Sequence, residues 1–400
     1  MKKLMLLGGI RYLLPAIEVA HRHGWYVITV DYLPNNIAHK FSDEYHNVSI
    51  LDKDIVLQLA MSLKIDGILS YAVDPGVVTA AYVAERMNLP FSCSYESACI
   101  LQDKAKFRNF LKENGFNVPN AKGYSNVEDA LRDVKLFNWP VIVKPVDSAG
   151  SKGVTRVDKL DDLKEAIVCA LEKSHNGHFI IEDFLEKDGL SSGSESFFVD
   201  GKLCFNAFYD QYFDSSAINP YTPSAECWPS AQSEEVLADV KRQLQRLGTL
   251  LNFQTGLFNV EFRLCKNGNV YLMEVSPRAG GNRLAEILNY ATDVNIIEKE
   301  IRKAVGQSVG ILHEPQYKGY FAIWVLHSIR EGFISEISID PDFKAKHVLE
   351  EEYRFKRGDR VTLFSGADTA IGTLFLRFES YSEMETALEA PNEWLNIIYL

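Results

Sequence analysis

The sequence predicts an α/β and α+β protein in three parts, and three observations support this fold class. The chain of 400 residues is too long for one ordinary domain and suits two or three. Up to about residue 95, short apolar runs alternate with amphipathic helical patterns, as in an open parallel sheet. From about residue 100 hairpin patterns dominate, and residues 311–400 are β-rich with several glycine turns. We expect domains at residues 1–98, 99–310 and 311–400.

The first of these domains begins with a strand–helix–strand unit. Residues 4–7 are apolar and end at Gly8 and Gly9, which predicts a buried strand. An amphipathic helix then runs to about His23, and residues 26–31 form the next strand. The G-x-G-x-x-G fingerprint of dinucleotide sites is absent here, so we interpret the unit as structural.

Composition excludes several classes of protein. The net charge of −12 argues against a nucleic-acid partner, because phosphate backbones require concentrated Lys and Arg. No apolar run approaches the roughly 18 to 20 residues of a membrane helix, and Arg11 interrupts the run that resembles a signal peptide. The six cysteines are scattered singly, as expected in a reducing cytoplasm.

The central part predicts helices that alternate with strands and hairpins. A tight turn at Asp200-Gly201 joins two strands, and residues 211–232 are expected to be irregular. We expect helices within residues 94–115, 126–137, 160–173, 233–251 and 292–305, and strands within 140–146, 179–185, 257–265 and 270–276.

Two glutamates on the last hairpin form a candidate metal site. Glu261 and Glu274 lie on adjacent strands around a turn near Gly268, so they face each other on one side. Carboxylates so placed repel each other unless a cation lies between them, and Mg²⁺ is commonly held by one or two carboxylates plus substrate phosphates. For the pair alone, a hairpin edge with two solvated glutamates remains the alternative.

A second candidate site surrounds Lys144, at the end of a β-branched strand. The small residues that follow leave backbone N–H groups free to wrap a phosphate, while a flexible hairpin loop is the alternative. Lys104 is either a second candidate cation or an ordinary surface lysine. Glu182 lies at a strand end, where it either contacts an adenine edge or is paired structurally with another residue. The candidate loop residues are Ser148, Gly150, Ser151, Lys152 and Gly153.

Taken in order, these motifs resemble the ATP-grasp superfamily. The resemblance rests on Lys104, "VIVKP" with its glycine-rich loop, "IIEDFL", "ESFFVDG", "NVEFRL" and "LMEVSPRAGG", and covers roughly residues 1–310. It implies a Rossmann-like pre-ATP-grasp domain, an ATP-grasp domain divided at residue 180 and a small C-terminal domain, as in biotin carboxylase, carbamoyl-phosphate synthetase and purine-pathway ligases. The first subdomain, 99–180, would carry the glycine-rich loop, and the second, 181–310, the metal site.

The resemblance also implies roles for individual residues. Glu261 and Glu274 correspond to ligands of Mg²⁺ or Mn²⁺, and Arg278 to the arginine that faces the transferred phosphoryl group. The implied ATP ligands are Lys104 and Lys144 for the phosphates, the loop from Ser148 to Gly153, Glu182 and Leu185 for the adenine, and Glu195 for the ribose.

Some positions depart from the family pattern or remain open. Ser276 stands where many members have asparagine, and the stretch "EKDGLSSGS" lengthens the approach to Glu195. Gly280 and Gly281 are expected to offer backbone N–H groups to an oxyanion. Arg283 either pairs with a substrate carboxylate or lies on the surface at a helix N-terminus.

The expected function is that of an ATP-dependent carboxylate–amine ligase, which forms an acylphosphate that an amine displaces. Residues 206–232 contain no basic cluster for a ribonucleotide phosphate, which favours an amino acid or small amine as substrate. The alternatives are a bicarbonate- or formate-using enzyme of the purine-pathway or carboxylase type and a non-catalytic nucleotide-binding protein. Related enzymes are often homodimers, so the resemblance implies a homodimer in the cytoplasm.

Overall fold

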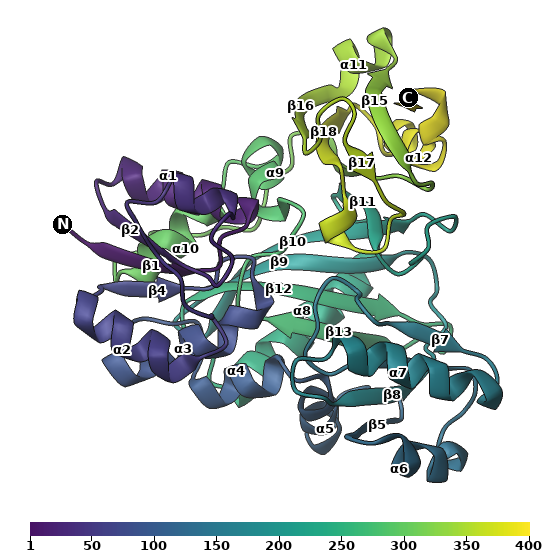
Figure 1. Cartoon of the computed structure of the whole chain (residues 1–400), viewed down its shortest axis with the longest axis horizontal. Coiled ribbons are helices and arrows are strands. Elements are labelled where there is room, and N and C mark those ends of the chain that lie inside the picture. The colour runs from purple at the N-terminus through teal and green to yellow at the C-terminus, as the bar shows by residue number, and fades with distance from the viewer.

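The computed structural model describes all 400 residues and confirms the mixed fold (Figure 1). Near the N-terminus, a parallel sheet of order β3-β2-β1-β4 carries helices on its faces. No helix combines the length and apolar character that crossing a bilayer requires. The N-terminal elements are β1 (Lys3–Leu7), α1 (Leu14–Arg22), β2 (Tyr26–Val30), β3 (Glu44–His46), α2 (Lys53–Leu63), β4 (Gly67–Leu69) and α3 (Val77–Met87).

A small antiparallel sheet, with order β5-β8-β6-β7, follows in the chain. Its core forms where alternate strand residues such as Val141 and Ile181 meet the apolar face of a helix around Ile167. The elements of this part are α4 (Tyr95–Leu101), α5 (Lys104–Glu113), β5 (Ala121–Tyr124), α6 (Val127–Arg132), β6 (Val141–Pro145), β7 (Thr155–Val157), α7 (Leu163–Lys173) and β8 (Phe179–Asp183).

The helix predicted within residues 94–115 is divided in the structure. The Asp103 side chain accepts hydrogen bonds from the backbone N–H groups of Ala105 and Lys106, so it caps a new helix at Lys104. A second difference is that a separate helix, α9 (Leu284–Ala291), precedes the helix predicted over 292–305, and its only sign in the sequence was the helix N-terminus considered for Arg283. The helix α10 (Ile296–Ala304) then begins at an Asn295 cap rather than at residue 292.

An eight-stranded sheet forms the centre of the molecule, with order β13-β12-β9-β10-β11-β14-β18-β16 (Figure 1). Asp200 and Gly201 have φ of 48° and 78°, which confirms the predicted tight turn between its longest strands. The prediction that residues 211–232 are irregular is wrong in part, because two strands extend into this segment. The strands and the adjoining helix are β9 (Ser191–Val199), β10 (Lys202–Phe213), β11 (Pro223–Trp228), α8 (Glu234–Leu250), β12 (Gly256–Leu264) and β13 (Val270–Ser276).

The C-terminal strands β14, β16 and β18 continue the same sheet, and a separate three-stranded sheet of order β17-β15-β19 lies beside them. The expected β-rich character of residues 311–400 is therefore confirmed. The elements are β14 (Tyr320–Leu326), β15 (Gly332–Ile339), α11 (Pro341–His347), β16 (Val348–Tyr353), β17 (Arg360–Val361), β18 (Gly372–Phe378), α12 (Tyr381–Glu389) and β19 (Leu395–Tyr399).

The N-terminal sheet, the central sheet and helices α9 and α10 share one apolar core. Leu13, Leu257 and Ile301, from three distant parts of the sequence, are all buried in this cluster. Because the core fixes these parts against one another, the loop after β4 lies against the end of β13. The candidate site forms at that junction.

Candidate active site

The two hairpin glutamates lie directly opposite each other, as predicted. Glu261 on β12 pairs with Glu274 on β13, immediately before a bulge in the register. Lys104 Nζ lies 3.2 Å from Glu274 Oε2. Burial and the charge of Glu274 raise the pKa of Glu261 to about 7. For Glu274, burial works in the opposite direction to Lys104 and Arg278, and these two cations lower its pKa.

This pair fits a divalent metal ion. Both carboxylates are half-buried, and Lys104 and Arg278 only partly offset their mutual repulsion, because the pKa of Glu261 remains raised. Mg²⁺ and Mn²⁺ prefer oxygen ligands, and a cation between the two would remove the repulsion that raises the pKa of Glu261. The metal role of Glu261 and Glu274 remains a prediction that this geometry supports.

Lys144 lies in a buried ion-pair triad that the sequence did not reveal. Glu182 Oε2 is 2.7 Å from Lys144 Nζ, and Glu182 Oε1 is 2.8 Å from Arg108 Nε. Burial, with the charges of Arg108 and Lys104, lowers the pKa of Lys144 to about 8 despite Glu182. Burial opposes the ionised form of Glu182, but Arg108 and Lys144 outweigh it and lower the pKa to about 2.

The triad confirms the alternative that Glu182 is paired structurally, and it argues against the adenine role that the resemblance implies. Both of its carboxylate oxygens face cations, so its side chain is not free to contact an adenine edge. The hinge prediction then rests on Leu185, whose carbonyl accepts a hydrogen bond of 3.4 Å from Arg263 Nη1. Arg108 had a signal in the sequence, because it follows Phe107 and precedes Leu111 on the apolar face of α5.

The glycine-rich loop lies next to these cations. Lys104 Nζ donates a 2.9 Å hydrogen bond to the carbonyl of Ser148. Three residues of the loop have left-handed backbone conformations: φ is 67° at Gly150, 57° at Ser151 and 70° at Gly153. Glycine adopts such conformations without steric cost, which explains why two of these three positions are glycines. The phosphate-binding role of the loop remains a prediction.

The same loop is tied to two distant segments. Ser151 Oγ donates a 2.8 Å hydrogen bond to the carbonyl of Tyr221. Asn219 Nδ2 donates to the carbonyls of Ser151, at 2.9 Å, and of Ser365, at 3.0 Å. Lys152 Nζ lies 3.3 Å from Asp368 Oδ2. The segment after β10 and the C-terminal part therefore hold the loop in place.

Arg278 is held by Asp74, which comes from the loop after β4. Asp74 Oδ1 accepts from Arg278 Nε at 2.8 Å and Asp74 Oδ2 accepts from Arg278 Nη2 at 2.7 Å. Ser276 Oγ donates to the same carboxylate at 2.9 Å and accepts from Gln102 Nε2 at 2.7 Å. Asp74 was missed, although its place at the carboxyl end of a parallel strand is where ligands of such sheets bind.

Glu195 is not placed as a ribose ligand, which corrects that prediction. Its side chain is fully buried beside Asn259, whose Nδ2 donates to Glu195 Oε1 at 2.8 Å. The N–H of Gly280 donates to the same oxygen at 3.0 Å, so it is also not free for an oxyanion. Burial raises the pKa of Glu195 to about 7. Of the two glycines, Gly281 alone keeps its predicted role.

Arg283 lies at the N-terminus of α9, as one of the two interpretations expected, but its side chain is committed to an ionic cluster and is not exposed on the surface. Its side chain is only 10% exposed, and its Nη2 lies 2.7 Å from Glu286 and 2.5 Å from Glu350. Its Nη1 is 3.7 Å from Glu352. Arg283 thus ties the start of α9 to β16 and is not free to bind a substrate carboxylate.

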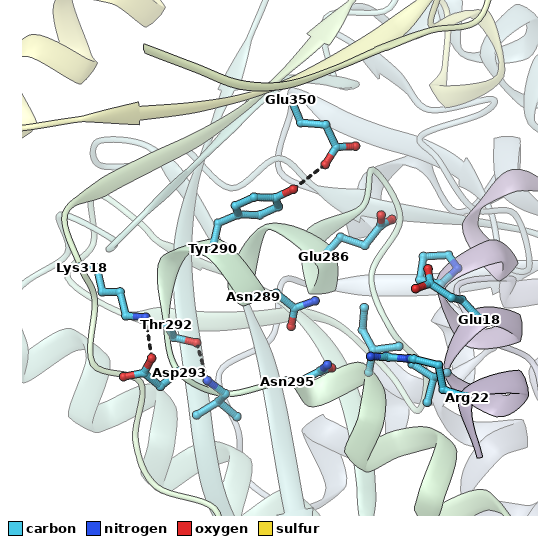
Figure 2. A pocket seen from close by; sticks show the side chains of 14 residues that line it. Glu18, Arg22, Glu286, Asn289, Tyr290, Thr292, Asp293, Asn295, Lys318 and Glu350 are labelled. Atoms are coloured by element: carbon cyan, nitrogen blue, oxygen red, sulfur yellow. Dashed lines mark hydrogen bonds and ion pairs between the residues drawn. The ribbon is translucent and has the colours of Figure 1, made fainter. Parts of the chain in front are cut away.

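A cavity of about 500 Å³ opens beside this cluster, between α1 and α9 (Figure 2). It includes Glu286 and Glu350, the ion-pair partners of Arg283, together with Tyr290, whose hydroxyl donates to Glu350 at 2.9 Å. None of the predicted nucleotide or metal ligands lines it. The candidate active site is therefore the junction of Lys104, Glu274 and Arg278, and not this cavity.

Comparisons with known proteins agree with the predicted family. Residues 137–286 match the model of the ATP-grasp domain. The carbamoyl phosphate synthase large chain of Thermoanaerobacter sp. strain X514 is 27% identical over 264 residues, which cover 63% of this chain and 23% of that protein. The chain thus spans about a quarter of the length of this curated relative.

Two solved structures share the fold over the whole chain. An L-amino acid ligase from Bacillus licheniformis superimposes with a TM-score of 0.82 at 21% identity, covering 100% of this chain and 99% of that one. The biotin carboxylase domain of Hydrogenobacter thermophilus 2-oxoglutarate carboxylase, solved with MgADP, ADP and bicarbonate, has a TM-score of 0.74 at 16% identity. It covers 100% of this chain and 91% of that one. The fold prediction is confirmed.

Proposed function

The chain carries an ATP-grasp domain, and from this premise we propose that it is an ATP-dependent ligase that joins a carboxylate to an amine. The observation that carries the proposal is the direct opposition of Glu261 and Glu274 with Lys104 against one of them. Arg278 adds a second fixed cation at the end of the same hairpin. This arrangement suits a triphosphate whose γ-phosphoryl group is transferred.

Each residue has a defined task in the proposed reaction. Lys104 and Lys144 bind the phosphates of ATP, and the glycine-rich loop covers them. Mg²⁺ bound by Glu261 and Glu274 would neutralise charge on the triphosphate. An oxygen of the substrate carboxylate attacks the γ-phosphorus, and ADP leaves. Arg278 stabilises the negative charge that develops on the transferred group.

The second half of the reaction forms the C–N bond. The amine nitrogen attacks the carbonyl carbon of the acylphosphate, inorganic phosphate leaves with the electron pair of the broken C–O bond, and the amine loses a proton. Arg278 stabilises the tetrahedral adduct as well in this proposal, with the support that it lies on the same loop as Gly281. The products are ADP, phosphate and an amide.

The amine substrate is proposed to be an amino acid or another small amine. The segment 206–232 has no basic cluster, and one of the structures that shares the fold is an L-amino acid ligase. The proposed partners of the chain are its two substrates, a small carboxylate and a small amine. Its proposed location is the cytoplasm. We also propose that the chain forms a homodimer. Light scattering would test this by measuring the mass of the protein in solution.

A second candidate function uses bicarbonate in place of a larger carboxylate. Its support is the biotin carboxylase domain of similar fold, which was solved with bicarbonate and MgADP. The active-site residues would perform the same steps, with carboxyphosphate as the product of the first one. An absolute requirement of ADP formation for bicarbonate would favour this function over the first.

The test is ADP release from Mg·ATP in a matrix of amino acids and small carboxylates, with and without bicarbonate. The ligase predicts ADP only with particular pairs and none from a folded Glu274→Ala variant. Glu379→Ala, at an 80% exposed side chain remote from the site, is the matched control and should remain active. Tight ATP binding without ADP from any pair, or unchanged turnover in Glu274→Ala, would overturn the proposal.

A further inference from the structure

Glu226 on β11 is a buried carboxylate to which the proposed mechanism gives no task. The residue is 2% exposed, and its Oε1 accepts a 2.9 Å hydrogen bond from Asn282 Nδ2. Its other oxygen, Oε2, is fully enclosed and has no hydrogen-bond partner. Leaving a buried acceptor unpaired costs free energy, so such an atom requires a physical explanation.

Glu226 shares a face of the central sheet with the metal carboxylates. Because side chains two residues apart on a strand lie on one face, Trp228 is on the same face of β11 as Glu226. The ring of Trp228 lies 5.1 Å from that of Tyr209 on β10, so Tyr209 is on this face too. Tyr209 is opposite Gly193 on β9, and Gly193 is opposite Glu261 on β12. In Figure 1, β11 lies across β9 and β10 from β12, on the side of the C-terminal strands.

The charges around Glu226 leave it without a cation. Burial raises the pKa of Glu226 to about 8, the hydrogen bond from Asn282 opposes this shift, and the charge of Glu261 adds to it. Glu195, which is equally buried, accepts two N–H donors and lies in the field of Arg278. Glu226 differs from it because no Lys or Arg is paired with it and no cation is among the groups that shift its pKa.

The partner of Glu226 belongs to the loop that carries the catalytic arginine. Asn282 follows Arg278 by four positions and has a φ of 49°, a left-handed conformation that is uncommon outside glycine. The hydroxyl of Tyr12 donates to Asn282 Oδ1 at 3.3 Å. Asn282 is thus fixed from both sides, and the loop that it ends is held at a set distance from Glu226.

We propose that Glu226, oriented by Asn282, binds the amino group of the amine substrate, and that this substrate is a primary aliphatic amine that arrives as an ammonium ion. The inference rests on the proposed ligase function and adds the chemical class of the nucleophile. The bound ammonium group releases one proton to solvent before its nitrogen attacks, and the amide nitrogen loses a second proton after the attack. An ammonium group supplies both the N–H donor that Glu226 Oε2 lacks and the positive charge that its surroundings lack. That charge favours the ionised form of a carboxyl group whose raised pKa, about 8, keeps it largely protonated near pH 7 without a ligand.

A second metal ion fits this position less well than an ammonium group. A metal site requires several ligand atoms with free lone pairs. The partner of Glu226 is instead the side-chain N–H of Asn282, which is a hydrogen-bond donor and cannot bind a metal ion. One free acceptor oxygen beside a fixed amide matches a single N–H bond of a ligand. The position on the sheet face of Glu261 also brings that ligand to the side where the acylphosphate forms.

Trapping with hydroxylamine separates binding of the amine from formation of the acylphosphate. Hydroxylamine is largely neutral near pH 7 and reacts with an acylphosphate to give a hydroxamate and phosphate. The variant Glu226→Gln should form hydroxamate from ATP and the carboxylate at the wild-type rate. Its KM for a primary amine substrate, found by testing amino acids one at a time, should rise about tenfold or more.

Two further variants complete the test. Asn282→Gly, which tolerates the left-handed backbone, should also raise the KM for the amine. Glu314→Gln is the matched control, because Glu314 also accepts from an asparagine amide, that of Asn206 at 3.3 Å, on an exposed position. The melting temperature of Glu226→Gln should not fall, since the substitution removes a buried carboxylate.

The outcomes for the inference and for the proposed function are distinct. An unchanged KM for the amine in Glu226→Gln, or an equal loss of hydroxamate and amide, would overturn the role of Glu226 and leave the ligase function standing. No hydroxamate from the wild-type protein with any carboxylate would overturn the proposed function itself.

Discussion

The Asp74 carboxylate holds the Arg278 guanidinium through two hydrogen bonds, of 2.8 Å and 2.7 Å, across 204 positions of the sequence. Arg278 Nη1 completes the arrangement with a 3.0 Å hydrogen bond to Asn259 Oδ1. Two planar groups joined at two points have little freedom to rotate. The N-terminal sheet therefore sets the orientation of the arginine at the end of β13.

Substituting Asp74 with Asn should lower kcat about 10- to 100-fold and change the KM for ATP little. Asparagine keeps the shape of the side chain but loses the charge and one acceptor, so Arg278 is no longer held in one orientation, and small misplacements are costly. Steady-state kinetics of ADP release would measure this change. Retention of wild-type kcat in a folded Asp74→Asn protein would show that Arg278 is oriented without Asp74.

Substituting Arg108 with Met should shift the pH dependence of ATP binding. Lys144, with a pKa of about 8, loses its charge as the pH rises through that value, so ATP affinity should fall there. Arg108 is one of the cations that lower this pKa, and without it the fall should move to higher pH. Titration of ATP binding across pH 7 to 10 would show the shift, whereas a purely structural role of Arg108 would weaken binding equally at every pH.

The sequence predicts best what local geometry determines. Glu261 and Glu274 were placed opposite each other because a short turn near Gly268 fixes the register of the hairpin. The turn at Asp200-Gly201 was predictable for the same reason. In both cases the residues that decide the structure lie within a few positions of one another.

Contacts between distant segments could not be predicted in this way. Asp74 meets Arg278, and Arg108 meets Glu182, only because separate sheets pack together. The predictions for Glu195 and Arg283 failed on the same ground, since neither exposure nor partners can be read from neighbours in the chain. Two usable signals remained: a charged residue on an apolar helix face, as at Arg108, and a carboxylate after the carboxyl end of a parallel strand, as at Asp74.

Mg²⁺ should stabilise the protein more at pH 8 than at pH 5.5. Glu261 has a pKa raised from 4.5 to about 7, so between these values the folded protein holds a proton that the unfolded chain releases. Metal binding requires the ionised carboxylate and therefore strengthens as the pH rises through 7. The increase in melting temperature with millimolar Mg²⁺ measures this effect.

Glu261→Gln provides the comparison for this experiment. Without the charge of Glu261, the variant should show little Mg²⁺-dependent shift at either pH, while Glu379→Gln should behave like the wild type. A shift that is equal at both pH values in the wild type would mean that Mg²⁺ binds elsewhere than at the hairpin.

Substituting Asn219 with Ala should weaken ATP binding by up to about 30-fold. The side chain donates two hydrogen bonds, to Ser151 in the glycine-rich loop and to Ser365 in the C-terminal part, and each contributes about 1 kcal/mol. Losing both leaves the loop less ordered, so binding must supply the ordering free energy.

Asn267→Ala serves as the control for Asn219, because Asn267 Nδ2 donates a 2.8 Å hydrogen bond to the Tyr271 hydroxyl at a turn outside the loop. ATP affinity from calorimetry, together with the rate of proteolysis within residues 148–153, would follow both variants. Faster cleavage with weaker ATP binding in Asn219→Ala alone is expected, because the segment after β10 then no longer holds the loop. Unchanged cleavage and affinity would show that Lys152 and Ser151 keep the loop closed without Asn219.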